Sequence, residues 1–434
     1  MRDVIVMFIV VSGSLAALRR PWIGIMVWTW LSLMNPHRFT WGFAYDAPVA
    51  LMAASATFIG ALLTRDRESP FKGTPAVLLL LFMIWMTLSW YFGLGRDGDY
   101  QQWIKVMKID VMILVALALL NSKKHIFSLA WVATGSLALL GAKGGLFTLM
   151  TGGGEHVFGP PDSFIEDNNE FALALVITIP MLRFLQMQLS SVAAKHGMTA
   201  LMVFCAASAL GSQSRGALLA ISAMSILLWW RGKNRLGVGI VMLVTAAALL
   251  VFMPDTWTHR MSTISSYEED TSAMGRISAW WNAWNLAFHY PLGVGFNAAR
   301  PELFALYSPY PDVVLAAHSI YFQMMGNHGF IGLAIFLLIW ITTWRSAGWL
   351  RTQTTDAAEA KWCKDLGAMY QVSLIGFAVG GAFLSLSYFD LPYNISVLIM
   401  LTRRWVKTRG WEREPAYEGG WRSIPGLTVP TRVG

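Results

Sequence analysis

Residues 75–92 read PAVLLLLFMIWMTLSWYF, an apolar run without a charged side chain. A helix of roughly 20 apolar residues is long enough to cross the hydrocarbon core of a bilayer. All such runs are predicted to be helices, because backbone that faces lipid must satisfy its own hydrogen bonds. We therefore expect an all-α polytopic membrane protein with about 12 transmembrane helices. The runs lie at about 3–18, 21–34, 47–63, 75–92, 103–120, 125–150, 170–189, 198–211, 214–231, 236–253, 319–344, 366–387 and 391–402.

The composition supports a membrane protein. The chain has 434 residues, of which 55% are hydrophobic and 13% are charged, whereas about 25% of the residues in a soluble domain are charged. The net charge is +8, but the basic residues lie in short loops and do not cluster as they do in a nucleic-acid-binding face. There is no P-loop and no dinucleotide fingerprint, which argues against a nucleotide-driven pump.

The distribution of Lys and Arg predicts the topology. Alternate loops and the C-terminal tail hold 22 of the 33 basic residues, and this set is expected to be cytoplasmic. The other loops, including 35–46, 151–169 and 254–318, are then extracytoplasmic. We expect a transmembrane domain over residues 1–405 and a cytoplasmic tail over 406–434. The loop 254–318 is expected to be structured, because a loop of this length is usually functional.

One segment of that loop, residues 276–289, predicts an amphipathic helix. Its Trp280, Trp284 and Phe288 recur every fourth residue and therefore share one face. An aromatic face of this kind suits the membrane interface.

Arg215 is a candidate anion-binding residue. It follows Gly211-Ser-Gln-Ser214 in a polar break between two apolar runs, and Ser214 or Ser212 can cap the second helix. A helix N-terminus and a guanidinium both favour a phosphate. The alternative is an arginine that extends to lipid headgroups.

His318 is a candidate general base. It stands where the long loop re-enters the membrane, and an imidazole with a pKa near 6.5 suits proton transfer there. The alternative is a histidine that caps a helix. His328, ten residues further on, is expected to be structural.

Other cations are candidates for donor or acceptor contacts. Arg276 and Arg300 lie in the long loop and either bind an anion or anchor the loop at the interface. Lys143 falls within an apolar run, where a charge is costly and usually has a function. Its expected partner is Asp110, Glu170 or a substrate phosphate. The acidic residues are scattered and Glu155-His156 lacks further ligands, so no metal site is predicted.

These motifs together resemble the O-antigen ligase and polymerase superfamily of bacterial inner membranes. Ser214-Arg215-Gly216 is followed by a long loop with Arg276-x3-Trp280 and Pro291-Leu-Gly-Val-Gly295, and then by His318-Ser319-x9-Gly329. The stretch Glu166-Asp167-Asn168-Asn169-x-Phe-Ala-Leu-Ala resembles the family's Asp/Asn-rich segment before a span. Asn35-Pro-His-Arg38 resembles a branch of O-glycosylation ligases associated with exosortase systems. At 319 the chain has Ser where many members have Asn.

The resemblance implies a GT-C-like glycosyltransferase that takes O-antigen polysaccharide from undecaprenyl diphosphate on the periplasmic side. The acceptor would be lipid A–core oligosaccharide. Membrane lipids would surround the protein, and the reaction would need no cofactor. His318 would be the base, and Arg215 and Arg276 would bind the diphosphate. Arg38, Lys143, Asn168, Asn169 and Arg300 are the further candidate contacts.

Two alternatives stay open. A polymerase or a protein O-glycosylation ligase shares these motifs and the same donor. A transporter of lipid-linked or anionic cargo is the alternative from another class, although its inverted repeats are not evident in the sequence. The glycan, the acceptor sugar, the oligomeric state and the side of the N-terminus are not determined by the sequence.

Overall fold

A computed structural model describes residues 1–231, 239, 271–353 and 357–414, and these residues form helices and connecting loops without a strand. The principal helices are α1 (Arg2–Arg19), α2 (Pro21–Met34), α3 (Val49–Leu63), α4 (Thr74–Phe92), α5 (Arg96–Leu119), α6 (Lys123–Met150), α7 (Asn168–Met187), α8 (Val192–Gly211), α9 (Arg215–Arg231), α12 (Thr271–His289), α13 (Pro301–Tyr307), α14 (Ile320–Thr352), α15 (Lys361–Gly380), α16 (Asp390–Lys407) and α17 (Gly410–Arg413). Short 3-10 turns occur at η1 (Pro36–Phe39), η3 (Ala358–Ala360) and η4 (Gly381–Phe383).

The predicted apolar segments coincide with helices wherever the structure describes them. Six of the described helices, α4, α6, α7, α8, α14 and α15 (with η4), are long and apolar enough to cross a membrane, and α2 and α3 are shorter apolar helices. The segment predicted at 236–253 and residues 254–270 of the long loop lie outside the described residues, apart from residue 239. The helical class is thus confirmed for the described residues, and a count of about 12 spans stays a prediction.

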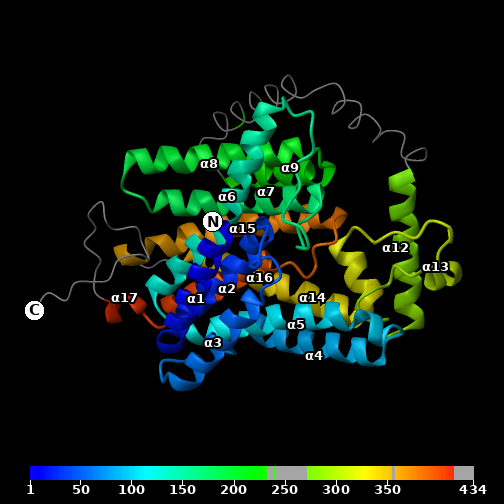
Figure 1. Cartoon of the computed structure of the whole chain (residues 1–434), viewed down its shortest axis with the longest axis horizontal. Coiled ribbons are helices and arrows are strands. Elements are labelled where there is room, and N and C mark those ends of the chain that lie inside the picture. Colours follow the sequence, from blue (N-terminus) through cyan, green and yellow to red (C-terminus); the bar gives the residue numbers. More distant parts are fainter. Residues whose placement is uncertain (232–238, 240–270, 354–356, 415–434) are drawn as a thin grey trace, which may run out of the picture.

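The two sets of loops lie at opposite ends of the helices (Figure 1). The basic set meets at one end, here called the basic end, through contacts of Glu68 with Arg404, Lys123 with Glu414 and Gln188 with Asp365. The longer loops meet at the other end, here called the loop end, through contacts of Leu94 with Val294, Arg38 with Asp162 and Asn168 with Ser212. This division is the one that the charge pattern predicted.

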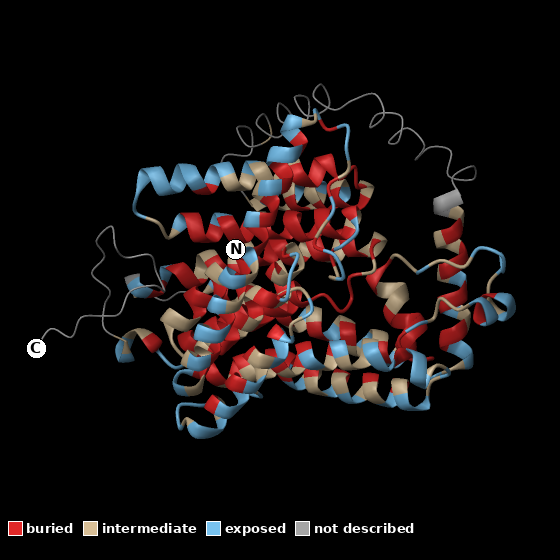
Figure 2. Cartoon of the chain, in the orientation of Figure 1, coloured by how far each residue is buried: buried red, intermediate tan, exposed pale blue. Residues whose placement is uncertain are grey.

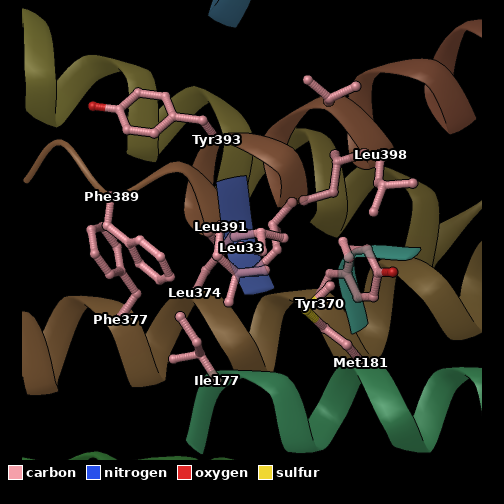
Figure 3. Close-up of a cluster of buried hydrophobic side chains, with 14 of the residues drawn as sticks. Leu33, Ile177, Met181, Tyr370, Leu374, Phe377, Phe389, Leu391, Tyr393 and Leu398 are labelled. Atoms are coloured by element: carbon pink, nitrogen blue, oxygen red, sulfur yellow. The ribbon is translucent and has the colours of Figure 1, made fainter. Parts of the chain in front are cut away.

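The centre of the bundle is built on α7, α15 and α16 (Figure 2). Of the most apolar 18 residues of α7, 83% are buried, compared with 33% for α4 and 22% for α8. A helix that is apolar all round belongs in a protein interior or in lipid, so α7 fills the interior while α4 and α8 present apolar faces outward. Figure 3 shows the central packing, where Ile177 of α7 and Phe377 of α15 approach Leu391 of α16 and Leu33 of α2.

The aromatic helix of the long loop is confirmed, and it begins earlier than predicted, at Thr271. In Figure 1, α12 runs across the loop end of the bundle. Its aromatic stripe packs against α14: the Trp280 ring stacks on Phe322 with centroids 4.8 Å apart, and Trp284 and Phe288 meet Phe330 at 5.5 and 5.0 Å. The stripe therefore fixes α12 to α14, and a position of this helix at the membrane interface stays a prediction.

Helix α14 is interrupted at Gly329, whose φ of +68° is not helical. The interruption lies beside Pro291-Leu-Gly-Val-Gly295, and a Cβ on Gly329 would lie 2.6 Å from the Pro291 carbonyl oxygen. Only glycine combines this backbone conformation with so close an approach. The first part of α14 is thereby directed toward α12 and carries the residues at its start into the loop end.

Candidate functional site

His318 stands directly before α14 in a backbone conformation that side-chain-bearing residues rarely adopt, with φ of +41°. The indole nitrogen of Trp280 donates a hydrogen bond to the carbonyl oxygen of Ala317 at 2.7 Å. This bond fixes the backbone directly before His318. Strained backbone of this kind costs free energy and persists where the surroundings impose it, often at functional sites. The next side chain, Ser319, is buried and its hydroxyl makes no hydrogen bond within the described residues.

Two charged side chains from distant parts of the chain act on the His318 imidazole. Burial lowers its pKa below the ordinary 6.5, the positive charge of Arg276 lowers it further, and the Asp167 carboxylate opposes both. Arg276 lies one helical turn before Trp280, so the two side chains share the face of α12 that meets residues 317 and 318. His318 is consequently a neutral imidazole at neutral pH, the form that can accept a proton.

Asp167 is the N-cap of α7. Its carboxylate accepts hydrogen bonds from the backbone and side-chain nitrogens of Asn169 at 2.9 and 3.0 Å. Burial raises the pKa of Asp167, but the Asn169 bonds, a hydrogen bond with Glu170 and the His318 charge outweigh burial, and the net pKa is lowered. Asp167 therefore stays ionised and supplies a fixed negative charge beside His318.

The turn between α8 and α9 places Arg215 at the start of α9. Ser214 caps that helix, since its hydroxyl accepts a hydrogen bond from the Ala217 N–H at 3.3 Å, as predicted. The turn contains a second residue with positive φ, Gln213 at +56°. Asn168 Nδ2 donates to the Ser212 carbonyl oxygen at 2.6 Å, which ties this turn to the start of α7. Asn168 is thus a structural link between the Asp167 and Arg215 segments.

The segment after α15 completes the site. Gly216 of α9 lies against the end of α15 and the start of this segment, since a Cβ there would be 3.6 Å from both the Gly380 oxygen and the Phe383 Cβ. The same segment continues to Ser385, which lines an open cavity of about 440 Å³. The cavity is also lined by Phe158, Ser163, Phe164, Glu166, Asp167 and Glu170. Carboxylates of the α6–α7 loop and of the first turn of α7 therefore face an accessible space at the loop end.

Two further cavities adjoin this central one. A cavity of about 220 Å³ shares Phe158 with it and is lined by Lys143 and His156. A cavity of about 430 Å³ shares Ser163 and Phe164 with it. This last space lies beside Lys105 and Lys108 of α5, which sequence reasoning did not include among the candidates.

The other predicted cations, Arg300 and Arg38, contact residues other than His318. Arg300 forms a buried ion pair with Asp99 at 2.9 Å, with side chains 13% and 6% exposed, so a partner inside the fold accounts for its charge. Arg38 pairs with Asp162 at 3.4 Å, and its guanidinium lies 4.7 Å from the centroid of the Tyr45 ring.

Lys143 Nζ lies 4.8 Å from the centroid of the Phe39 ring. Lys143 forms no ion pair with Asp110 or Glu170, so the prediction that one of these carboxylates is its partner is wrong. A contact between Lys143 and a substrate phosphate stays a prediction.

His328 has the structural role expected of it. Its ring is completely buried, with Nδ1 3.0 Å from Ser89 Oγ and Nε2 2.7 Å from the Tyr388 hydroxyl. Both nitrogens are thus occupied by neighbours from α4 and from the segment before α16, which locks the break in α14.

The fold and the site together define a multi-pass helical membrane protein with a histidine, an arginine and a carboxylate grouped at one end of its bundle. Residues 200–337 match the O-antigen ligase family model, and this match supports membership of the O-antigen ligase superfamily. Residues 1–191 match a family of unknown function (DUF5935). No curated protein matches the sequence. Arg215, Arg276 and His318 fall within the O-antigen ligase match, whereas Asp167 belongs to the other region.

Sequence reasoning placed Asp167 in the Asp/Asn-rich segment and named Glu170 as a partner for Lys143, but it included neither of them, nor Ser385, among the site residues. The spacing of Asp167 and Glu170 has the form of a capping box, which signals a helix start and could have drawn attention to both. Ser385 carries no such signal, because only the folding of α15 against α7 and α9 brings it to the cavity. Within the described residues, no group of three His, Cys, Asp or Glu side chains could hold a metal ion.

Proposed function

We propose that the protein is a glycosyltransferase that moves O-antigen polysaccharide from undecaprenyl diphosphate to lipid A–core oligosaccharide. The reaction would take place on the periplasmic side of the bacterial inner membrane, without a cofactor. The observation that carries the proposal is the grouping of His318 with Arg276 and Asp167 at the loop end, with two of these three residues inside the O-antigen ligase match.

The chemistry follows from the charges. The neutral His318 imidazole takes the proton from the acceptor hydroxyl, whose oxygen attacks the anomeric carbon of the donor sugar. The bond from that carbon to the diphosphate oxygen breaks, and its electron pair leaves with the diphosphate. Attack from the side opposite the leaving group inverts the anomeric centre. Arg215 and Arg276 stabilise the departing negative charge, and fixed cations can do this in place of a metal ion.

Asp167 has a supporting role in this scheme. When His318 accepts the proton it becomes an imidazolium between a cation and a carboxylate. Arg276 disfavours that imidazolium and Asp167 favours it, so the balance of the two charges sets how readily the base takes and releases its proton. A base works best when its pKa lies near the operating pH.

The decisive experiment is transfer by the purified protein from an undecaprenyl-diphosphate glycan to lipid A–core. We expect His318→Ala to lower the rate by roughly 10²-fold or more, the contribution typical of a general base. His196→Ala is the matched control, because His196 is exposed on α8 near the basic end and should leave the rate unchanged. Equal rates in the His318 variant and the wild type would remove His318 from the chemistry.

The same assay separates the alternatives. Lengthening of the lipid-linked glycan without transfer to the core would identify a polymerase, and labelling of a protein acceptor would identify a protein ligase. EDTA should leave transfer intact, since Arg215 and Arg276 are proposed to neutralise the diphosphate. Activity lost in EDTA and restored by a divalent cation would contradict the metal-independent scheme.

A further inference from the structure

A second charged cavity, of about 210 Å³, lies at the basic end. It is bounded by the N-terminus of α4, the C-terminus of α5, and by α14 and α16, and is therefore far along the helices from the His318 site (Figure 1). Leu117, Met400 and Leu401 give it apolar walls. Its cations are Lys72, Arg403, Arg404 and Lys407.

Two of these cations already have a partner. Glu68 pairs with Lys72 at 2.8 Å and with Arg404 at 3.6 Å. Arg404 also donates to the carbonyl oxygen of Leu117 at 2.9 Å, near the end of α5. The charge of Glu68 is thus shared by these two cations, and Arg404 additionally serves to close a helix end.

The other two cations have no counter-ion among the described residues. Arg403 donates to the neutral Ser346 hydroxyl at 3.0 Å, and its Nε is buried without a hydrogen-bond partner. The cationic groups of Arg403 and Lys407 lie 5.3 and 5.9 Å from the centroid of the same Trp349 ring. Two like charges held over one ring repel each other, and a buried guanidinium nitrogen without an acceptor is costly. Both costs fall if an anion occupies the cavity.

We propose that this cavity binds the phosphate of an anionic phospholipid. Arg403 and Lys407 would bind the phosphate oxygens, and Arg403 Nε would gain the acceptor that it lacks. The apolar walls at Met400 and Leu401 fit the start of an acyl chain, which a free phosphate ion does not have. Basic pockets between transmembrane helices are typical sites for anionic lipid headgroups. The proposal concerns the end of the molecule opposite the transfer site and does not depend on the proposed function.

The test uses the purified full-length protein in a neutral detergent, titrated separately with phosphatidylglycerol, phosphatidylcholine and inorganic phosphate. Bound lipid is counted by native mass spectrometry and the thermal midpoint is recorded. We expect phosphatidylglycerol to bind and to raise the midpoint. Arg403→Gln and Lys407→Gln should each weaken binding about tenfold, which is the effect of losing one hydrogen bond to a charged group. Lys195→Gln is the control, since Lys195 is exposed near the same end but lies outside the cavity.

Each outcome decides the proposal. If both variants bind phosphatidylglycerol as the wild type does, or if phosphatidylcholine binds equally well, the site is overturned. If inorganic phosphate raises the midpoint as much as the lipid does, a lipid is overturned as the occupant. Arg403→Gln removes a partly buried side chain and could disturb folding. Lys407 is exposed, so if Arg403→Gln does not fold, the lipid binding of Lys407→Gln decides the proposal.

Discussion

At the scale of the residue, His318 is defined by its neighbours more than by its own chemistry. Burial and Arg276 hold its pKa below 6.5 while Asp167 raises it. The imidazole is a base only when unprotonated, so transfer should be lost as the pH falls through this pKa. We expect kcat/KM to fall to half its plateau at a pH below 6.5. A half-point above 6.5 in the wild type would contradict the assignment of this limb to His318.

The two neighbouring charges should shift that pH dependence in opposite directions. Asp167→Asn removes a carboxylate that favours the imidazolium, so the pKa of His318 falls and the acid limb moves to lower pH. Arg276→Gln removes a repelling cation, so the limb moves to higher pH, and the rate falls as well if Arg276 binds the diphosphate. Asn caps helices about as well as Asp does, so the first variant should fold. Opposite shifts in the pH profile of kcat/KM are a result that a structural role alone would not produce.

At the scale of the element, the break in α14 positions the site. Gly329 has a φ of +68° and approaches the Pro291 carbonyl, so α14 turns where it meets the Pro291–Gly295 segment. The buried ring of His328 and the Tyr388 hydroxyl lock the break from the other side. The break thereby places the start of α14, and His318 before it, against α12.

Gly329→Ala should destabilise the protein. A side chain in this backbone region costs roughly 1–3 kcal/mol, and the new Cβ would in addition lie 2.6 Å from the Pro291 oxygen. A lower thermal midpoint in detergent would show this loss. Gly135→Ala is the matched control within α6, because a Cβ there meets nothing within 4 Å. Equal midpoints for the two variants would mean that the break in α14 is not needed.

At the scale of the whole molecule, the buried Asp99–Arg300 pair joins α5 to the segment that carries α12 and α13. Asp99 also accepts a hydrogen bond from the Phe296 N–H at 2.7 Å. The pair therefore fastens the loop that carries Arg276 onto the helical bundle. The ion pair with Asp99 gives the Arg300 charge a partner inside the protein, so no substrate is needed to account for it.

Arg300→Ala should lower stability by about 3–5 kcal/mol, because it leaves the Asp99 charge buried without a partner. Asp99→Asn in the same chain should recover part of the loss, since it removes that charge. Arg409→Ala is the control: its pair with Glu412 is exposed, and such pairs contribute about 0–1 kcal/mol. Thermal midpoints and transfer rates should be measured together. Transfer lost at unchanged stability would instead favour a substrate contact for Arg300.

The sequence by itself determined the helices and the two ends of the molecule. Apolar runs of bilayer length and the positions of Lys and Arg are local properties of the chain, so they predicted the described helices and the division of the loops. The same local signals predicted the Ser214 cap before Arg215, the aromatic helix and the place of His318 at the start of α14.

Only the tertiary structure decided which charges meet. Arg276 and Asp167 act on His318 from 42 and 151 residues away in the chain, Arg300 pairs with Asp99, and Lys143 pairs with neither of the carboxylates expected for it. Helical periodicity fixes which face of its own helix a side chain occupies, but not which helix lies opposite. That choice depends on packing among all the helices, such as the break at Gly329 and the placement of Ser385 beside α7, and no single segment of the sequence contains it.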